Sequence, residues 1–131
     1  MTVASFVKSF DMERMIAYSG PGNLHSSDEA AQKAGLPKAI VQGGFLVACL
    51  SELMIREYGE PYFSGGSIAV NLLKPVTAGT SVTCFLAEEA PAEDADEDAV
   101  IQCKIWMENE DGDLCAAGGA TVPARARGNS A

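Results

Sequence analysis

His25 is the only histidine in the chain and the residue best suited to transfer a proton. Histidine changes its charge close to neutral pH, so its imidazole can act as a general acid or a general base. The sequence places His25 at a junction between a loop and a helix, because the stretch 19–23 holds two glycines and a proline. The alternative is that the imidazole only caps the helix that follows.

Gly43 and Gly44 are the second candidates. They lie in the expected first turn of a long helix, where backbone N–H groups lack partners within the helix and the helix dipole is positive. Because glycine has no Cβ, a thioester carbonyl could approach these N–H groups closely. Such contacts would stabilise the enolate that forms when a proton moves at the α-carbon. The alternative is that the glycines only allow close packing.

The elements around these candidates predict an α+β domain. The long helix is expected over 41–58, ended by Gly59, with apolar residues on nearly every side, so it should be surrounded. Strands are expected over 5–10, 67–73, 82–87, 100–108 and 114–122, with a turn at Asp111 and Gly112. A helix followed by consecutive antiparallel strands suggests a curved sheet wrapped around one long central helix.

Two short helices are expected before the long one. Asp11 should cap a helix over 12–18. Ser26 and Glu29 have the spacing of a capping box for a second helix, which would end near Gly35.

Length and composition favour one soluble domain. The 131 residues, 47% hydrophobic, suit a single core, which we expect over 1–123, followed by a frayed tail over 124–131. The net charge of -9 disfavours binding to nucleic acid or to anionic lipid. No charged leader followed by an apolar segment opens the chain, so we expect a cytoplasmic protein.

Neither the cysteines nor the aspartates predict a metal site. The four cysteines show no CxxC spacing and lie among apolar neighbours, so reduced thiols in the core are expected. Asp94, Asp96 and Asp98 fall in an acidic stretch over 88–98, which is expected to be a solvated loop. This stretch lacks the glycine and the closing glutamate of a calcium loop. No metal and no cofactor are expected.

Three stretches resemble the MaoC-like family of enoyl-thioester hydratases. Residues 18–37, YSGPGNLHSSDEAAQKAGLP, are similar to its motif SGDxNPxHxDxxxAxxxGxxxxxxHG. Residues 41–46, VQGGFL, resemble the start of its central helix, and residues 66–82 resemble its strand, its PV turn and its Gly-Asp-x-Val step. The resemblance covers nearly all of the chain before the acidic stretch.

The resemblance implies a hotdog fold, dimerisation, and the addition or removal of water on a 2-enoyl or 3-hydroxyacyl thioester of coenzyme A or acyl carrier protein. His25 matches the family's catalytic histidine, and Gly43 matches the glycine of its oxyanion hole. The substrate-contacting positions carried over from the family and from the helix start are Asn23, Gln42, Gly44 and Ser51.

The chain departs from the family motif at two positions. The family's aspartate is absent, because one residue is deleted and Pro21 or Gly20 stands in its place. Gln42 replaces the usual histidine before the glycine, and an amide can form hydrogen bonds but cannot titrate near neutral pH. Loss of one proton-handling group costs roughly 10² to 10⁴ in rate.

Two further functions therefore stay open. The first is a hotdog acyl thioesterase, because Gln42 and the two glycines also resemble the HGG start of that class, although Glu52 lies one residue from the expected carboxylate position. The second is a subunit that binds thioesters without catalysing their conversion and pairs with another hotdog chain. The missing aspartate motivates this second alternative.

Overall fold

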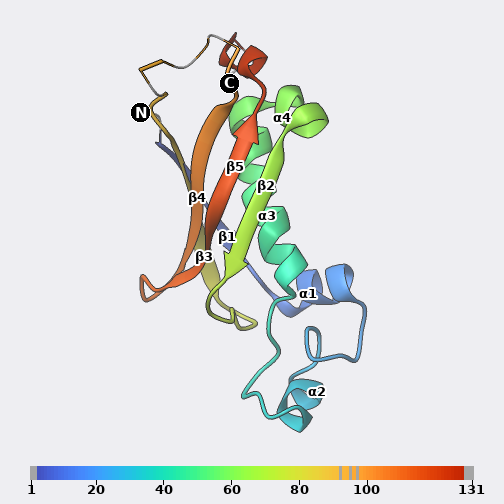
Figure 1. Ribbon diagram of the computed structural model, residues 1–131. Coiled ribbons are helices and arrows are strands. Elements are labelled where there is room, and N and C mark those ends of the chain that lie inside the picture. Colours follow the sequence, from blue (N-terminus) through green and yellow to red (C-terminus); the bar gives the residue numbers. More distant parts are fainter. Residues whose placement is uncertain (1–2, 92, 95, 97, 129–131) are drawn as a thin grey trace.

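The computed structural model describes residues 3–91, 93, 94, 96 and 98–128 (Figure 1). The elements follow in the order β1 (Val3–Ser9), α1 (Met12–Ser19), α2 (Asp28–Lys33), α3 (Gly43–Tyr58), α4 (Glu60–Gly65), β2 (Ser67–Leu72), β3 (Ser81–Glu88), β4 (Ile101–Asn109), β5 (Leu114–Val122) and the 3-10 helix η1 (Ala124–Gly128).

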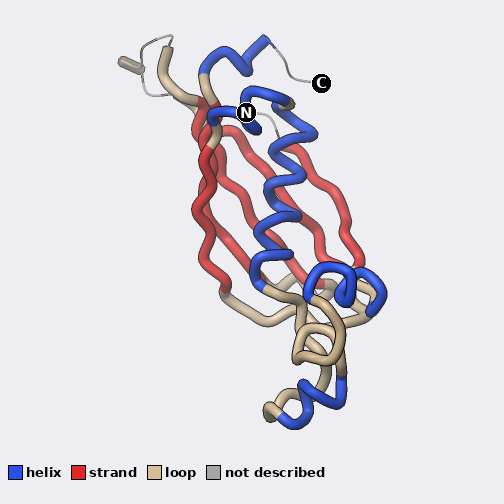
Figure 2. The backbone as a smooth tube through the Cα atoms, turned by 90° about the vertical axis from the view of Figure 1, so that its right-hand side faces the viewer, coloured by secondary structure: helices blue, strands red, loops and turns tan. Residues whose placement is uncertain are grey.

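One curved sheet carries α3 on its inner face, as the sequence predicted. The strand order is β1-β3-β4-β5-β2, and each neighbouring pair is antiparallel. Figure 2 shows α3 lying lengthwise over the sheet, whereas α1, α2 and their loops extend beyond one end of it. Strands β1 and β2 form the two edges.

Alternation of apolar and polar residues explains why one face of the sheet packs against the helix. In β4, Ile101, Cys103, Ile105 and Met107 are buried, while Gln102 and Lys104 face outward and are exposed. Successive side chains of a strand point to opposite faces, so this pattern buries one face only. The β4–β5 turn follows at Asp111 and Gly112, as expected, with Gly112 at φ 82°.

Helix α3 begins at Gly43 and is covered by the sheet on one side only. Leu46, Leu50 and Met54 are buried against the sheet. Ala48 and Ile55, on the outer side, are exposed. The expectation that the helix is surrounded on all sides is therefore wrong for this single chain, because one sheet reaches only one side of a helix.

Side chains cap both α1 and α2, as expected, but the cap of α2 lies one residue later in the chain than predicted. The Asp11 carboxylate accepts a hydrogen bond from the Arg14 N–H at 2.8 Å and caps α1, as predicted. Helix α2 is capped by Ser27, whose hydroxyl accepts from the Ala30 N–H at 3.2 Å, and not by Ser26. The Ser26 hydroxyl is buried and accepts from the Asn23 N–H, so it stabilises the preceding loop instead.

The four cysteines are free and buried, as predicted. Burial raises the pKa of the Cys84 thiol to about 12, which keeps this thiol protonated at neutral pH. Among the described residues, no group of three or more histidine, cysteine, aspartate or glutamate side chains is arranged to hold a metal ion. Within the same residues, no helix is long and apolar enough to cross a membrane.

The acidic stretch was expected to be a solvated loop and the tail over 124–131 to be frayed, and the structure treats these two segments differently. Glu93, Asp94, Asp96 and Asp98 are exposed, and residues 92, 95 and 97 lie outside the described residues. In the expected tail, Ala124–Gly128 forms η1, where Ala126 is fully buried. Arg125 forms an ion pair with Glu60 at 2.9 Å. Residues 129–131 lie outside the described residues, and the domain boundary at 123 stays a prediction.

Replacing Gly118 should destabilise the sheet where β5 meets β2. A Cβ at this position would overlap the carbonyl oxygen of Ala69 and lie 2.8 Å from Cα of Val70. Because both contacts are with backbone, we expect Gly118→Ala to lower the free energy of unfolding by about 1–3 kcal/mol. Chemical denaturation measures this change. Gly119→Ala is the matched control, since its Cβ would lie 3.4 Å from the carbonyl oxygen of Cys103, and an equal loss in both variants would contradict the explanation.

Candidate active site

The loop that carries His25 is held by hydrogen bonds to its own backbone and to the segment that connects β2 with β3. The Asn23 side chain donates to the carbonyl of Ser19 at 2.9 Å and accepts from the His25 N–H at 2.9 Å. Further along, the Val41 N–H donates to the carbonyl of Val76 at 2.8 Å. These contacts fix the position of a loop that would otherwise project freely beyond the sheet.

The imidazole of His25 is oriented by a backbone carbonyl. Its Nδ1 lies 3.0 Å from the carbonyl oxygen of Ile40. A carbonyl oxygen can only accept a hydrogen bond, so Nδ1 carries the proton and, in the neutral ring, Nε2 carries the lone pair. The Ile40 peptide is itself fixed, because its N–H donates to the carbonyl of Leu24 at 3.1 Å. No hydrogen-bond partner of Nε2 is found among the described residues.

His25 and Gly43 line the same cavity, whose volume is about 260 Å³. The rest of its lining is mostly apolar and comes from the loop before α3, from α3 and from the end of β2; it comprises Ile40, Val41, Leu46, Leu72, Leu73, Lys74 and Pro75. No carboxylate is among these lining residues. The cavity thus combines an acid–base group, the start of a helix and a surface suited to hydrocarbon.

The start of α3 leaves backbone donors available. The N–H groups of Phe45 and Leu46 donate to the carbonyl of Gln42, at 2.9 and 3.3 Å. Those of Gly43 and Gly44 have no acceptor among the described residues. A Cβ added to Gly43 would lie 2.5 Å from Cδ1 of Leu72, at the cavity, so the absence of a side chain lets Leu72 pack against the helix start.

Gly44 faces the other side of the helix. A Cβ added to Gly44 would lie 2.9 Å from the hydroxyl of Tyr18, and Gly44 is not among the residues that line the His25 cavity. Gly43 and Gly44 therefore lie on different sides of the first turn of α3, Gly43 beside Leu72 and Gly44 beside Tyr18.

Gln42 and Ser51 lie outside the cavity. The Ser19 hydroxyl donates to Oε1 of Gln42 at 2.7 Å, so Gln42 connects the start of α3 to the end of α1. The Ser51 hydroxyl lies 2.7 Å from the hydroxyl of Tyr62, about 12 Å from Gly43 along the helix axis. Of the residues predicted from sequence, His25 and Gly43 line one cavity. Asn23 contacts the backbone of His25, and Ser51 lies away from the cavity beside Tyr62.

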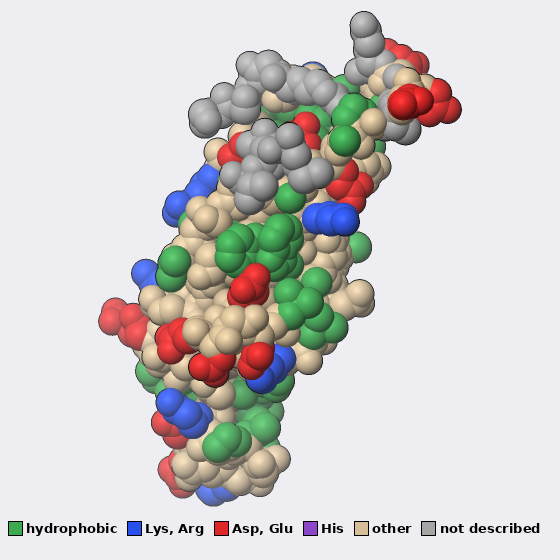
Figure 3. Space-filling model, turned by 90° about the vertical axis from the view of Figure 1, so that its left-hand side faces the viewer, with side chains coloured by type: hydrophobic (Ala, Val, Ile, Leu, Met, Phe, Trp, Pro, Cys, Tyr) green, Lys and Arg blue, Asp and Glu red, His purple; other side chains and the backbone are tan. Residues whose placement is uncertain are grey.

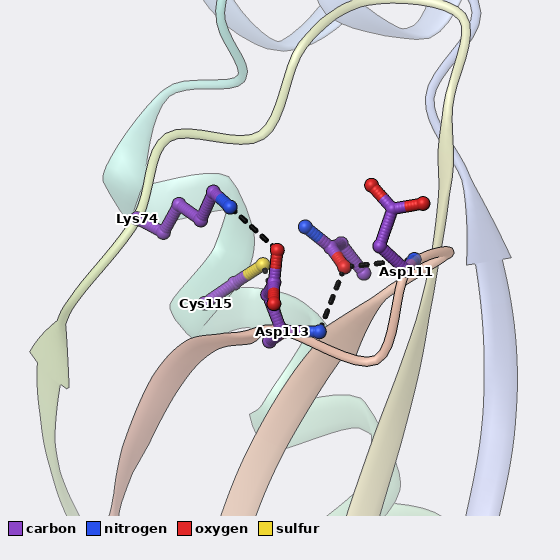
Figure 4. Close-up of polar contacts among 5 residues, drawn as sticks. Lys74, Asp111, Asp113 and Cys115 are labelled. Atoms are coloured by element: carbon purple, nitrogen blue, oxygen red, sulfur yellow. Dashed lines mark hydrogen bonds and ion pairs between the residues drawn. The ribbon is translucent and has the colours of Figure 1, made fainter.

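Lys74 lines the cavity while its charge is already paired. Its ammonium forms an ion pair with Asp113 at 2.6 Å, and Asp113 in turn donates its backbone N–H to the side chain of Asn109 (Figure 4). The hydrogen bond that the Lys74 ammonium donates to the Asp113 carboxylate raises the pKa of Lys74 and lowers the pKa of Asp113. Lys74 therefore stays charged and joins the cavity wall to the β4–β5 turn.

Sequence reasoning did not name several contributors to this site, among them the carbonyl of Ile40 and the side chains of Leu72 and Leu73. No residue-type signal marks a backbone carbonyl, because every residue has one. The leucines precede the Lys74-Pro75-Val76 segment that resembles the family, but only the packing of β2 beside α3 places them at the cavity.

A larger hollow, of about 510 Å³, lies on the outer face of the sheet and does not include His25. Trp106, Ala117 and Gly119 are among its lining residues, and the ring of Trp106 stacks on Phe85 at 5.3 Å. Figure 3 shows apolar side chains gathered on this face of the molecule, with charged ones around them. We assign the chemistry to the smaller cavity, because an acid–base side chain and free helix N–H groups meet only there among the described residues.

Solved structures with a similar fold include hydratases. The (R)-hydratase from A. caviae involved in PHA biosynthesis matches with a TM-score of 0.72 and 22% identity, covering 93% of this chain and 92% of that chain. R-hydratase PhaJ1 from Pseudomonas aeruginosa matches with a TM-score of 0.73 and 17% identity, covering 92% and 78%. The ChsH1–ChsH2 complex from Mycobacterium tuberculosis matches with a TM-score of 0.70 and 18% identity, covering 93% of both chains. These matches confirm the hotdog fold.

No curated protein sequence matches the chain. A comparison with family models does give a match, and it agrees with the structural matches. The family described as the MaoC like domain matches residues 14–105, a range that contains His25, Gly43 and the whole of α3. The chain therefore belongs to the MaoC-like family.

Proposed function

We propose that the protein is a hydratase or dehydratase that acts on 2-enoyl or 3-hydroxyacyl thioesters of coenzyme A or acyl carrier protein. The observation that carries this proposal is the shared cavity of His25 and Gly43, with Nδ1 of His25 held by the carbonyl of Ile40. This arrangement presents Nε2 as a base and the α3 N-terminus as an oxyanion hole.

In hydration, Nε2 of His25 takes a proton from water while the water oxygen bonds to the β-carbon of the enoyl thioester. The double-bond electrons move toward the thioester oxygen, and the N–H of Gly43 stabilises the enolate. The resulting imidazolium then returns the proton to the α-carbon, so one water molecule has been added. Dehydration follows the same steps in reverse.

His25 must serve both proton transfers, because the cavity lining contains no carboxylate. The position of the family aspartate is taken by Pro21 or Gly20. The aligned Nδ1–carbonyl contact keeps the ring in one tautomer, which is the task that a carboxylate often performs for a catalytic histidine. We therefore expect turnover to be slower, by a factor of roughly 10² or more, than at a site that has both a histidine and an aspartate.

The thioesterase alternative has little support, because Glu52 is engaged elsewhere. Its carboxylate binds Lys8 and Arg56, at 2.7 Å each, and does not line the His25 cavity. Burial alone would raise the pKa of Glu52, but these two cations together lower it. A carboxylate held in this way is poorly placed to activate water at a thioester bound at Gly43.

The second candidate function is a thioester-binding subunit that does not turn over substrate alone. The absence of a carboxylate in the cavity favours it. The similar ChsH1–ChsH2 structure is a complex of two different chains. Turnover by the purified chain excludes this candidate, whereas co-purification with a second hotdog chain that carries an Asp and His pair supports it. For either function we infer a cytoplasmic location, since four free thiols suit a reducing compartment.

Replacing His25 should remove activity without unfolding the protein. We expect His25→Asn to lower kcat by about 10²-fold or more, since an amide cannot transfer protons. The asparagine side chain can still donate to the carbonyl of Ile40, so thermal stability should stay close to wild type. Enoyl absorbance measures turnover, and thiol release measured in parallel detects thioesterase activity. An active, stable His25→Asn variant would show that the imidazole is structural.

Gly43→Ala should narrow the cavity. The added methyl group meets Cδ1 of Leu72, a side chain that is 53% exposed and free to move, so the fold should survive. A carbonyl displaced by about 1 Å loses roughly 10² in rate. We therefore expect kcat/KM and the affinity for a nonhydrolysable thioester analogue to fall, with an unchanged melting temperature. Gly119→Ala is the control glycine replacement, and normal binding and turnover by Gly43→Ala would refute the oxyanion hole.

The protein should form a dimer, either with a second copy or with another hotdog chain. Strand β2 is an edge of the sheet, and the two leucines at its end, Leu72 and Leu73, are 53% and 55% exposed. An open edge with apolar side chains favours pairing. We expect light scattering to give twice the 13.7 kDa monomer mass or more. A monomer mass across a range of concentrations would contradict the homodimer, and the absence of any co-purifying hotdog chain as well would contradict pairing altogether.

A further inference from the structure

A second cavity, of about 380 Å³, lies on the other side of the α3 N-terminus. It is lined by Lys8 from β1, by Arg14, Ala17 and Tyr18 from α1, and by Phe45 from α3. The proposed reaction uses none of these residues. The cavity thus combines two cations with two aromatic rings, in a chain whose net charge is -9.

Positive charge exceeds negative charge around this cavity. Lys8 and Arg56 share one carboxylate, that of Glu52, at 2.7 Å each. Arg14 donates to the backbone carbonyl of Ser9 at 2.7 Å, and no ion pair of its guanidinium is found among the described residues. The nearby Asp11 carboxylate accepts from the N–H of Arg14 as the cap of α1. The charge of Arg14 is therefore available to an anion.

The buried thiol of Cys49 reports the closeness of these charges. Burial raises its pKa to about 11, while Lys8 lowers it, Glu52 raises it and Arg14 lowers it. Lys8 and Arg14 thus act on the same point from two different elements, β1 and α1. Both side chains line this one cavity, so both cations can contact a single ligand there.

Tyr18 provides an open aromatic face. Its ring stacks on Phe45 with the centroids 4.6 Å apart and an interplanar angle of 10°. Tyr18 lines the cavity and is 45% exposed, so part of its side chain is accessible to a ligand. Phe45 is fixed in turn by an edge contact with Phe10 at 5.1 Å. A rigid aromatic surface next to two cations suits a planar base that carries phosphate groups.

The two cavities lie next to the same first turn of α3. Gly43 lines the His25 cavity and Phe45 lines the cationic one, about 3 Å apart along the helix axis. Gly44 lies between them, exposed, beside the hydroxyl of Tyr18. A ligand whose thioester carbonyl binds at Gly43 can therefore extend its carrier arm across Gly44 toward Arg14.

We propose that the cavity of Lys8, Arg14 and Tyr18 binds the nucleotide of coenzyme A, so that the substrate is a coenzyme A thioester. Arg14 and Lys8 bind the phosphates, and the adenine stacks on Tyr18. This inference rests on the proposed function. The arm of an acyl carrier protein has a phosphate but no purine, and it would leave the aromatic surface unused.

Binding of adenosine 3′,5′-bisphosphate tests the site without catalysis. Calorimetry should show saturable binding by the wild type. Arg14→Gln should bind with an affinity at least about ten-fold lower, because it loses one hydrogen bond from a charged group. Lys8→Gln should weaken binding in the same direction. Lys33→Gln removes an equal charge from an exposed position on α2 and should bind as the wild type does. Absence of binding by the wild type, or binding no tighter than that of inorganic phosphate, would overturn the nucleotide assignment.

Kinetics with two carriers separate this inference from the proposed function. For the same enoyl group, Arg14→Gln should raise KM about ten-fold with the coenzyme A thioester and leave KM unchanged with the pantetheine thioester. An equal rise in KM with both carriers would overturn the nucleotide site while leaving the hydratase proposal intact. If neither carrier is turned over by the wild type, the proposed reaction fails, and the bisphosphate measurement still decides whether the cavity binds a nucleotide.

Discussion

The hydrogen bond between Nδ1 of His25 and the carbonyl of Ile40 determines what chemistry the cavity can perform. It selects the tautomer with a basic Nε2 and sets the direction of the ring. It is also backed by backbone contacts, because Ile40 donates to Leu24 and the neighbouring Val41 donates to Val76. The orientation of the only histidine thus depends on the path of the main chain, and a chain that lacks the family aspartate can still present a base to the helix N-terminus.

The width of the cavity depends on close packing within the sheet. Gly118 of β5 lets β2 approach so closely that a Cβ would overlap the backbone of Ala69. Strand β2 ends at Leu72, which pairs with Ala116 and lies against the bare Cα of Gly43. Gly118 in the sheet and Gly43 at the start of α3 therefore both determine where Leu72 lies at the wall of the His25 cavity. Stability and function are linked here, since a shift of β2 would move one wall of the cavity relative to α3.

Local patterns in the sequence predicted most of the fold, and contacts between distant segments account for the rest. The alternation in β4 and the Asp11 cap depend on neighbours a few residues away, and both were predicted correctly. Helix α4 was missed because its six residues are too few to show a period, although Pro61 after Gly59 marks its start. His25 and Gly43 were proposed as site residues from residue type, from the expected helix start and from the family resemblance. Their shared cavity could not be, because it depends on how β2 and the Ile40 segment pack around α3.

The N-terminus of α3 divides the surface into an apolar side and a cationic side. Leu46 and Leu72 line the first, and Lys8 and Arg14 line the second. The helix dipole adds positive potential at the same point, which favours the binding of an anionic group there. A net charge of -9 over the whole chain would repel a phosphorylated ligand elsewhere on the surface. Under the proposed function, this arrangement gives a thioester with an apolar acyl group and an anionic carrier one favourable orientation, with its α-carbon at the helix start beside His25.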